Sequence, residues 1–336
     1  MDSLANYRDA LKEEMQRIVS PSESSPSLVY GMLQYHLGWV DAEFRPASSY
    51  GGKHLRPILL LLTTEAQGGE WQYALPAAAA LELLHNFTLI HDDIEDRDTR
   101  RRGKATLWSI WGVPQAINAG DALFTLAYRA LIDLRSQPLP AHRVIQALDR
   151  YTDAVLHVTE GQCRDIAFEC MDTVEEAEYL AMIDGKTAAL IGLAAELGGI
   201  VAGAPEANVT ALRTFGVALG KAFQMQDDLL GLWGDPERTG KPVGSDLRKH
   251  KKTLPILHGL QRSEKLRALL SQPSIGNEEV QQALSLLESV GSRSYTEAQA
   301  QRYHNQALEA LASSGGQGEA QPTLDSLVVD LLDRDI

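Results

Sequence analysis

The sequence predicts an all-α protein built as one large helical domain. The chain of 336 residues is rich in Ala and Leu, while aromatic residues make up only 6% of it, and this composition favours helices. Apolar residues recur with helical spacing, and no segment shows the alternation of apolar and polar residues that is typical of strands. Because no shift in composition marks a boundary, we expect a single domain over residues 1–336.

Polar or proline-rich stretches separate the first elements. A helix is expected over residues 3–19, ending at the stretch SPSESSPS, and a second over residues 28–44. The segment RPASSYGGKHLRP combines a Gly pair with Pro57 and predicts an exposed basic turn, after which helical periodicity resumes. Pro76 suits the first turn of a long apolar helix that continues without a breaker to about residue 98.

The rest of the chain predicts further helices and one long polar loop. Helices are expected over residues 114–135, 139–169, 173–198, 205–232, 251–261, 264–271, 277–312 (continuous or broken) and 323–334. The segment WGDPERTGKPVGSDLRKHKK is rich in Gly, Pro and charged residues. A long loop of this kind inside a compact domain is often functional.

Charge and composition exclude several classes of function. A formal charge of −14 argues against a nucleic-acid-binding protein, because such proteins neutralise phosphates with clustered Lys and Arg. The N-terminus lacks the features of a signal peptide, and the longest run of large aliphatic residues, Ile58 to Leu62, is far shorter than the roughly 20 residues of a membrane span. Cys163 and Cys170 match no zinc or disulfide pattern. We therefore expect a cytoplasmic protein without a membrane span.

Two acidic pairs stand at the ends of apolar segments. In LIHDDIEDRDTRRRGKAT, Asp92 and Asp96 lie four residues apart and share one helix face, while Asp93 points further round. In FQMQDDLLGLWGD, Asp227 and Asp228 end a second apolar helix. Mixed charges often mark a solvated helix end, which is the alternative interpretation. The apolar approach and the repetition favour carboxylates that face each other inside a bundle and bind a divalent cation such as Mg²⁺.

Candidate anion-binding cations occur in several loops. They are Lys53 and Arg56 in GGKHLRP, Arg101 and Arg102 in RRRGK, Lys186 in GKTAAL, Lys241 in TGKPVGSD, and Lys251 and Lys252 in KHKKTLP. A diphosphate site needs forked Arg donors, Lys charges and usually Mg²⁺. Each cation alone is typical of a protein surface, but the set suits a diphosphate that is bound together with metal.

Six stretches in fixed order resemble the motifs of the trans-isoprenyl diphosphate synthases, or polyprenyl synthetases: GGKHLRP, HDDIEDRDTRRRGKAT, GDALF, GKTAAL, FQMQDD and GDPERTGKPVGSDLRKHKKTLP. The resemblance extends over roughly residues 25–330. It implies an isoprenoid synthase bundle around a deep central cavity, normally a homodimer. It also implies a Mg²⁺-dependent prenyltransferase that condenses isopentenyl diphosphate with an allylic diphosphate.

The resemblance assigns the acidic residues to metal binding. It implies that Asp92 and Asp96 bind two Mg²⁺ ions, with Asp93 in support. A third Mg²⁺ would be bound by Asp227, with Asp228 beside it.

The cations would hold the two substrates. The resemblance implies that the allylic diphosphate is bound by Arg101, Lys186, Lys241 and Lys251. The diphosphate of isopentenyl diphosphate would be bound without metal by Lys53, Arg56, His85 and Arg102. Thr187, Gln224 and the carbonyl of Lys186 would stabilise the allylic cation through their dipoles, and the released diphosphate would take the proton.

Two positions depart from the common family pattern, and two others bear on product length. Gly231 stands where many members carry a fifth-position aspartate in the second motif, and His54 where many carry Arg. Phe87 and Thr88, five and four residues before Asp92, resemble the floor of the geranylgeranyl diphosphate synthases, which make a C20 product. A helical wheel places Phe87 about 140° from Asp92, so a core aromatic is the alternative.

Three alternative functions remain open at this point. The first is a synthase of another chain length, such as a farnesyl diphosphate synthase. The second is a terpene cyclase, against which the isopentenyl diphosphate pocket argues, because a cyclase has no use for it. The third is a non-catalytic prenyltransferase subunit, which loss of aspartates from the first motif would favour. No aspartate of that motif is lost.

Overall fold

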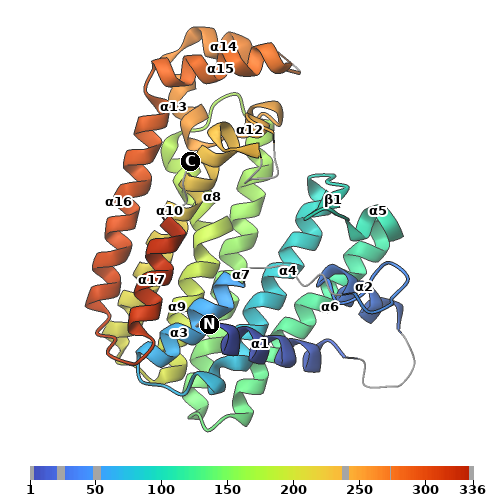
Figure 1. Cartoon of the computed structure of the whole chain (residues 1–336), viewed down its shortest axis with the longest axis vertical. Helices are drawn as coiled ribbons and strands as arrows, with labels where there is room; N and C mark the ends of the chain where they lie inside the picture. The colour runs from blue at the N-terminus through green and yellow to red at the C-terminus, as the bar shows by residue number, and fades with distance from the viewer. Residues whose placement is uncertain (1–3, 21–26, 48–53, 237–241, 273, 333–336) are drawn as a thin grey trace. The chain divides into compact units, whose positions relative to one another are not determined.

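The structure, a computed structural model, describes residues 4–20, 27–47, 54–236, 242–272 and 274–332 (Figure 1). These residues are helical almost throughout, which confirms the predicted all-α class. Contacts divide the chain into two compact units, which are described separately. The first comprises Met1–Asp149, Leu197–Ala204 and Gln317–Gln321, and the second comprises Arg150–Glu196, Pro205–Gly316 and Pro322–Ile336. A single domain over residues 1–336 stays a prediction.

The first unit is centred on a long apolar helix. Its elements are α1 (Ala5–Ile18), α2 (Leu28–His36), α3 (Leu55–Ala66), η1 (Trp71–Ala74), α4 (Leu75–Glu95), β1 (Arg100–Arg101), β2 (Lys104–Ala105), α5 (Leu107–Trp111), α6 (Val113–Ile132) and η2 (Asp133–Ser136). Pro76 lies in the first turn of α4, as predicted. The run Ala77 to Ala80 is fully buried, and these small side chains let α4 pack closely against its neighbours α3 and α6 (Figure 1).

The second unit is built around two long helices, α10 and α16, which run side by side (Figure 1). Its elements are α8 (Glu176–Ile183), η3 (Asp184–Ala188), α10 (Glu206–Trp233), α12 (Ser245–Arg248), α13 (Leu254–Arg262), α14 (Glu264–Leu270), α15 (Asn277–Ser289), α16 (Ser292–Ser313) and α17 (Gln321–Leu332). The helices α7 (Ala141–Glu169) and α9 (Ala189–Ala202) contribute residues to both units, as does α17 through its first residue, Gln321. Phe215, Met225 and Leu229 of α10 are fully buried in the core.

Two sequence predictions were wrong in detail. The helix expected over residues 28–44 ends at His36, because Gly38 takes the left-handed conformation (φ 80°) that terminates helices. The absence of strands was also wrong at one place. Arg100–Arg101 pairs with Lys104–Ala105 across a two-residue turn in which Arg102 (φ 50°) and Gly103 (φ 78°) both have positive φ, as a tight hairpin turn requires.

One stretch of the described residues, Glu176–Ala202, is long and apolar enough to cross a membrane by length and composition. It comprises α8, η3 and α9, and 83% of its most apolar window is buried in the folded chain. Buried core helices of other proteins share this property.

Candidate active site

The first acidic motif ends helix α4 in the first unit. Asp92 is half-buried in the last turn, and Asp96 is exposed at the C-cap, where its N–H donates to the carbonyl of Asp92 at 2.8 Å. Asp93, between them, is buried with only 2% of its surface exposed. The helix therefore places two accessible carboxylates one turn apart and sends the third into the protein.

Asp93 is bound to the hairpin that follows the motif. Its Oδ1 accepts a hydrogen bond from Nε of Arg101 at 2.7 Å. Burial raises the pKa of Asp93, while the charge of Arg101 and its hydrogen bond oppose that rise. Asp93, Arg101 and Arg102 also line a cavity of about 150 Å³ in the first unit. Asp93 thus fixes the position of Arg101, a residue predicted to hold diphosphate.

A buried glutamate organises the start of α3 against α4. Glu82 accepts from His54 Nδ1 at 3.0 Å, and Asn86 Nδ2 donates to the Glu82 carboxylate at 3.1 Å and to its carbonyl at 2.8 Å. His54 begins α3 in the left-handed conformation (φ 43°), and Arg56 lies in the first turn of that helix. Glu82 therefore ties the segment that carries Arg56 to the helix that carries His85.

Neighbouring groups in this cluster shift the pKa values of Glu82 and His85. Burial alone would raise the pKa of Glu82, but the hydrogen bond and charge of His54, together with the charge of Arg56, lower it to about 2. The pKa of His85 lies well below its ordinary value, because burial and the positive charge of Arg56 disfavour the imidazolium. Arg102 lowers the pKa of His85 further. Three of the four residues predicted for the isopentenyl diphosphate pocket thus interact electrostatically, and Lys53 lies outside the described residues.

Aromatic rings of α4 and α6 pack against one another in tilted and edge-to-face contacts. The ring of Phe87 lies 4.9 Å from that of Phe124, which lies 5.2 Å from that of Tyr128. On α4 itself, Phe87 packs against His91 at 4.7 Å. Phe87 precedes Asp92 by five residues, and a helix rises about 1.5 Å per residue, so the rings lie about 7 Å along α4 from the acidic motif. Thr88 is half-buried beside them, with its hydroxyl donating to the His85 carbonyl at 2.8 Å.

In the second unit a π-helical turn, η3, carries Lys186 and Thr187. The ammonium of Lys186 forms an ion pair with Asp165 of α7. The backbones of α7 and η3 also pack closely, because both carry glycine at the contact. A Cβ at Gly161 of α7 would lie 2.2 Å from the backbone nitrogen of Lys186, and one at Gly185 would lie 2.4 Å from the carbonyl oxygen of His157.

A buried hydrogen-bond network connects η3 with the second acidic motif. The Thr187 hydroxyl donates to Gln224 Oε1 at 2.7 Å, and Gln224 Nε2 donates to Asp228 Oδ1 at 3.0 Å. Asp228 Oδ2 also accepts from the Tyr179 hydroxyl at 2.7 Å and from the Leu254 N–H at 3.1 Å. Burial raises the pKa of Asp228 to about 7 despite these donors. Asp228 therefore orders the predicted cation-stabilising groups.

The other predicted residues of this unit are more accessible. Asp227 of α10 and Lys251, after α12, are both exposed. Lys241 lies outside the described residues.

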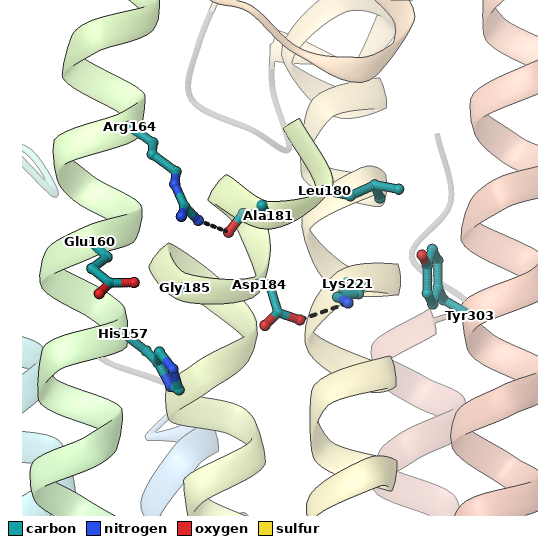
Figure 2. Close-up of a pocket in the computed structure, with 9 residues that line it drawn as sticks. All are labelled: His157, Glu160, Arg164, Leu180, Ala181, Asp184, Gly185, Lys221 and Tyr303. Atoms are coloured by element: carbon teal, nitrogen blue, oxygen red, sulfur yellow. Dashed lines mark hydrogen bonds and ion pairs between the residues drawn. The ribbon is translucent and has the colours of Figure 1, made fainter. Parts of the chain in front are cut away.

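The largely polar cavity of Figure 2, about 370 Å³ in volume, is a separate feature of the second unit. Figure 2 shows Arg164 donating to the Ala181 carbonyl (3.3 Å) and Lys221 paired with Asp184 (2.6 Å). None of the predicted site residues lines it.

The donor set fits a hard divalent cation that is shared with phosphate. Within the described ranges, no three His, Cys, Asp or Glu side chains converge into a complete metal site. Accessible carboxylate oxygens are nevertheless offered by the pair Asp92 and Asp96 in the first unit and by Asp227 in the second. Mg²⁺ prefers one or two carboxylates, with substrate phosphates and water completing its coordination.

Comparison with known proteins identifies the family. The chain matches the family model described as polyprenyl synthetase over residues 38–287. It belongs to the polyprenyl synthetase family. As a polyprenyl synthetase, it is a prenyltransferase.

Named relatives cover most of this polyprenyl synthetase. It is 40% identical over 311 residues to the (2E,6E)-farnesyl diphosphate synthase of Mycobacterium bovis, which covers 90% of this chain and 85% of that protein. It is 43% identical over 265 residues to the geranylgeranyl diphosphate synthase of Mycobacterium tuberculosis, covering 77% and 75%. The crystal structure of a polyprenyl synthase from Caulobacter crescentus, complexed with calcium and isoprenyl diphosphate, superposes with a TM-score of 0.82 at 28% identity, covering 100% of this chain and 98% of that chain.

Sequence reasoning missed two acidic residues of this polyprenyl synthetase. Glu82 connects Arg56 and His85, and Asp165 binds Lys186. For Glu82 a signal existed, because it is the one acidic residue in the apolar stretch AAAALELLHN. Asp165 lies in the polar stretch EGQCRDIAFE of α7, where its sequence context does not distinguish it from a surface acid.

Proposed function

We propose that this polyprenyl synthetase is a short-chain trans-prenyltransferase that condenses isopentenyl diphosphate with an allylic diphosphate and makes mainly geranylgeranyl diphosphate, a C20 product. The observation that carries the proposal is the arrangement on α4. Accessible Asp92 and Asp96 end the helix, and Phe87, which packs against Phe124, lies about 7 Å before Asp92 along its axis. A diphosphate bound at the carboxylates would direct its hydrocarbon tail toward those rings.

Within the first unit, the proposed roles follow from charge. Asp92 and Asp96 would hold Mg²⁺ against the allylic diphosphate, and Arg101, fixed by Asp93, would donate to the same group. Arg56 and Arg102, with Lys53, would hold the diphosphate of isopentenyl diphosphate. His85, which is neutral because burial and Arg56 depress its pKa, would donate one hydrogen bond there without adding charge.

Within the second unit, Asp227 would hold a further Mg²⁺, and Lys186, Lys241 and Lys251 would bind the allylic diphosphate. Asp165 holds Lys186 in place, so the lysine side chain loses little further freedom when it binds an anion. Mg²⁺ is supported by the carboxylate donors and by the calcium that accompanies isoprenyl diphosphate in the Caulobacter relative.

The reaction would need no protein nucleophile. Bound Mg²⁺ would withdraw charge from the leaving diphosphate. Arg101 and Lys186 would stabilise the same charge as the allylic C–O bond breaks. The Thr187 hydroxyl oxygen, Gln224 and the carbonyl of Lys186 would present their negative dipole ends to the allylic cation. The double bond of isopentenyl diphosphate would then attack that cation, and the released diphosphate would take the proton that leaves.

Product length is the finer part of the proposal. The relatives carry the names of both farnesyl and geranylgeranyl synthases, so their names allow either length. Support for C20 comes from Phe87, which occupies the fifth position before the motif and is backed by Phe124 and then by Tyr128. A farnesyl product is the alternative.

A product assay tests the function. Purified protein, Mg²⁺ and isopentenyl diphosphate are incubated with dimethylallyl, geranyl or farnesyl diphosphate, and the dephosphorylated alcohols are separated by chromatography. We expect mainly a C20 alcohol. A C15 alcohol as the end product would support the farnesyl alternative, and no condensation product would refute the proposal. Asp92→Asn should abolish the product, and the exposed Asp172→Asn should not.

We also propose that the enzyme acts in the cytosol as a homodimer. Exposed aliphatic side chains support the dimer: Ile110 on α5 is 38% exposed, and Val113 and Ile117 on α6 are 40% and 42% exposed. Neighbouring apolar side chains of this kind are typical of a surface that a partner covers. Light scattering of the purified protein would give the mass of the assembly.

A further inference from the structure

The second acidic motif lacks its fifth-position carboxylate, and another residue fills that space. The motif reads DDLLG, with Gly231 at its end. A Cβ atom added at Gly231 would lie 2.1 Å from Oδ2 of Asp246 and 2.6 Å from its Cγ, closer than non-bonded atoms can approach. The carboxyl group of Asp246 therefore occupies the place where a side chain at position 231 would begin.

This place lies on the same face of α10 as Asp227. Residues four apart on a helix are neighbours, with their Cβ atoms about 5–6 Å apart. Asp227 and Gly231 are so related, and both belong to the last two turns of α10. A carboxylate at the Cβ position of residue 231 can therefore share a cation with the carboxylate of Asp227.

The backbone holds Asp246 against α10. The N–H of Gly244 donates to the carbonyl of Leu232 at 3.1 Å, and the hydroxyl of Ser245 donates to the carbonyl of Gly231 at 3.2 Å. Gly244 itself has a φ of 70°, which glycine adopts without strain. These bonds fix α12 on the end of α10, so the position of Asp246 follows from the fold of the loop.

Negative charge accumulates at this end of α10. Asp227 is exposed, Asp228 is buried, and the carboxyl group of Asp246 lies beside Gly231, one turn further along the helix. Carboxylates placed this close repel one another, and a divalent cation between Asp227 and Asp246 would offset the repulsion.

We propose that Asp246 supplies the carboxylate that the second motif lacks at Gly231, and that it binds the same divalent ion as Asp227, directly or through a water molecule. The inference rests on the proposed function, because the ion is expected to arrive with a diphosphate. It also gives Gly231 a role, because any larger residue at position 231 would displace the carboxyl group of Asp246 from its present place.

Metal binding by the full-length protein tests the inference without measuring turnover. Mn²⁺ is titrated in the presence of inorganic diphosphate, and bound Mn²⁺ is counted by electron paramagnetic resonance. We expect Asp246→Asn to weaken one Mn²⁺ site about 10- to 100-fold, the range seen when groups that support a metal are removed. Asp227→Asn should weaken the same site, and the control Asp172→Asn, on an exposed acid of the same unit, should change nothing.

A second variant, in which the carboxylate is moved from position 246 to position 231, tests the inference if Asp246→Asn disturbs folding. Gly231→Asp alone should unfold at a lower temperature, because its Cβ meets Asp246. Combined with Asp246→Gly, the same substitution should restore both the melting temperature and the Mn²⁺ affinity. Wild-type Mn²⁺ affinity in Asp246→Asn would overturn the inference, as would a folded double variant that lacks the site.

The product assay separates this inference from the proposed function. If wild-type protein makes a prenyl product and Asp246→Asn binds Mn²⁺ normally, only the role of Asp246 is refuted. If wild-type protein makes no product and Asp246→Asn still loses the Mn²⁺ site, the role of Asp246 stands and the proposed function is refuted.

Discussion

Glu82→Gln should destabilise the protein by roughly 3 kcal/mol at pH 7. Glu82 is 5% exposed, and its carboxylate is held by His54 and Asn86. Gln keeps the size of the side chain and removes the charge. The magnitude follows from the pKa of Glu82, which falls from an ordinary value of 4.5 to about 2 on folding. A difference of one unit corresponds to about 1.4 kcal/mol, so the carboxylate contributes roughly 3 kcal/mol when it is ionised in both states.

The sign of the pH dependence follows from the same shift. A carboxyl group whose pKa is lowered by folding stabilises the folded state above the unfolded pKa, near 4.5, and loses this effect as pH falls through the folded pKa. The difference between wild-type protein and Glu82→Gln should therefore shrink from roughly 3 kcal/mol at pH 7 to about half of that at pH 3.

Urea unfolding of both proteins, followed by tryptophan fluorescence at each pH, measures the difference. Glu196→Gln is the matched control, because Glu196 is equally buried but burial raises its pKa, and neutralising it should not carry the same cost at pH 7. Equal stability of wild-type protein and Glu82→Gln at pH 7 would refute the reasoning, as would a difference that grows at lower pH.

Three further substitutions test the packing around the proposed substrates. Phe87→Ala should lengthen the main product by at least one five-carbon unit, because it removes a ring that packs 4.9 Å from Phe124; chromatography showing unchanged length would remove its role as a floor. Asp165→Asn should raise KM for the allylic diphosphate about tenfold, or ~1.4 kcal/mol, because Lys186 loses its ion pair; steady-state kinetics with an equal rise in KM for isopentenyl diphosphate would contradict this. Gly161→Ala should lower stability by about 1–3 kcal/mol, because its Cβ would lie 2.2 Å from the backbone nitrogen of Lys186; an unchanged thermal midpoint would count against that packing.

Much of the helical fold was predictable from local sequence. The first turn of α4 at Pro76 and the apolar run that follows are both visible as periodicity, and so is the position of Asp92 near the end of the helix. The β1–β2 hairpin was not predictable in this way, because its strands have two residues each and its turn depends on a positive φ at Arg102, a residue type that rarely adopts it.

The partners of the site residues were not predictable from local sequence. Asp93 and Asp228 read as members of metal-binding pairs, but each is buried and accepts hydrogen bonds from another element, Arg101 for the first and Tyr179 for the second. The π-helical turn at Lys186 likewise depends on close packing against α7 rather than on its own sequence. Spacing gives the face of a helix on which a residue lies, and tertiary packing decides what that face meets.

The most direct test of the proposed function is a crystal structure of the full-length protein with Mn²⁺ and inorganic diphosphate, in which anomalous scattering locates each metal ion. We expect diphosphate bound to manganese ions that are held by Asp92 and Asp96 at the end of α4. Manganese and diphosphate bound elsewhere, with Asp92 and Asp96 holding neither metal nor diphosphate, would contradict the central claim that these carboxylates bind the substrate through metal.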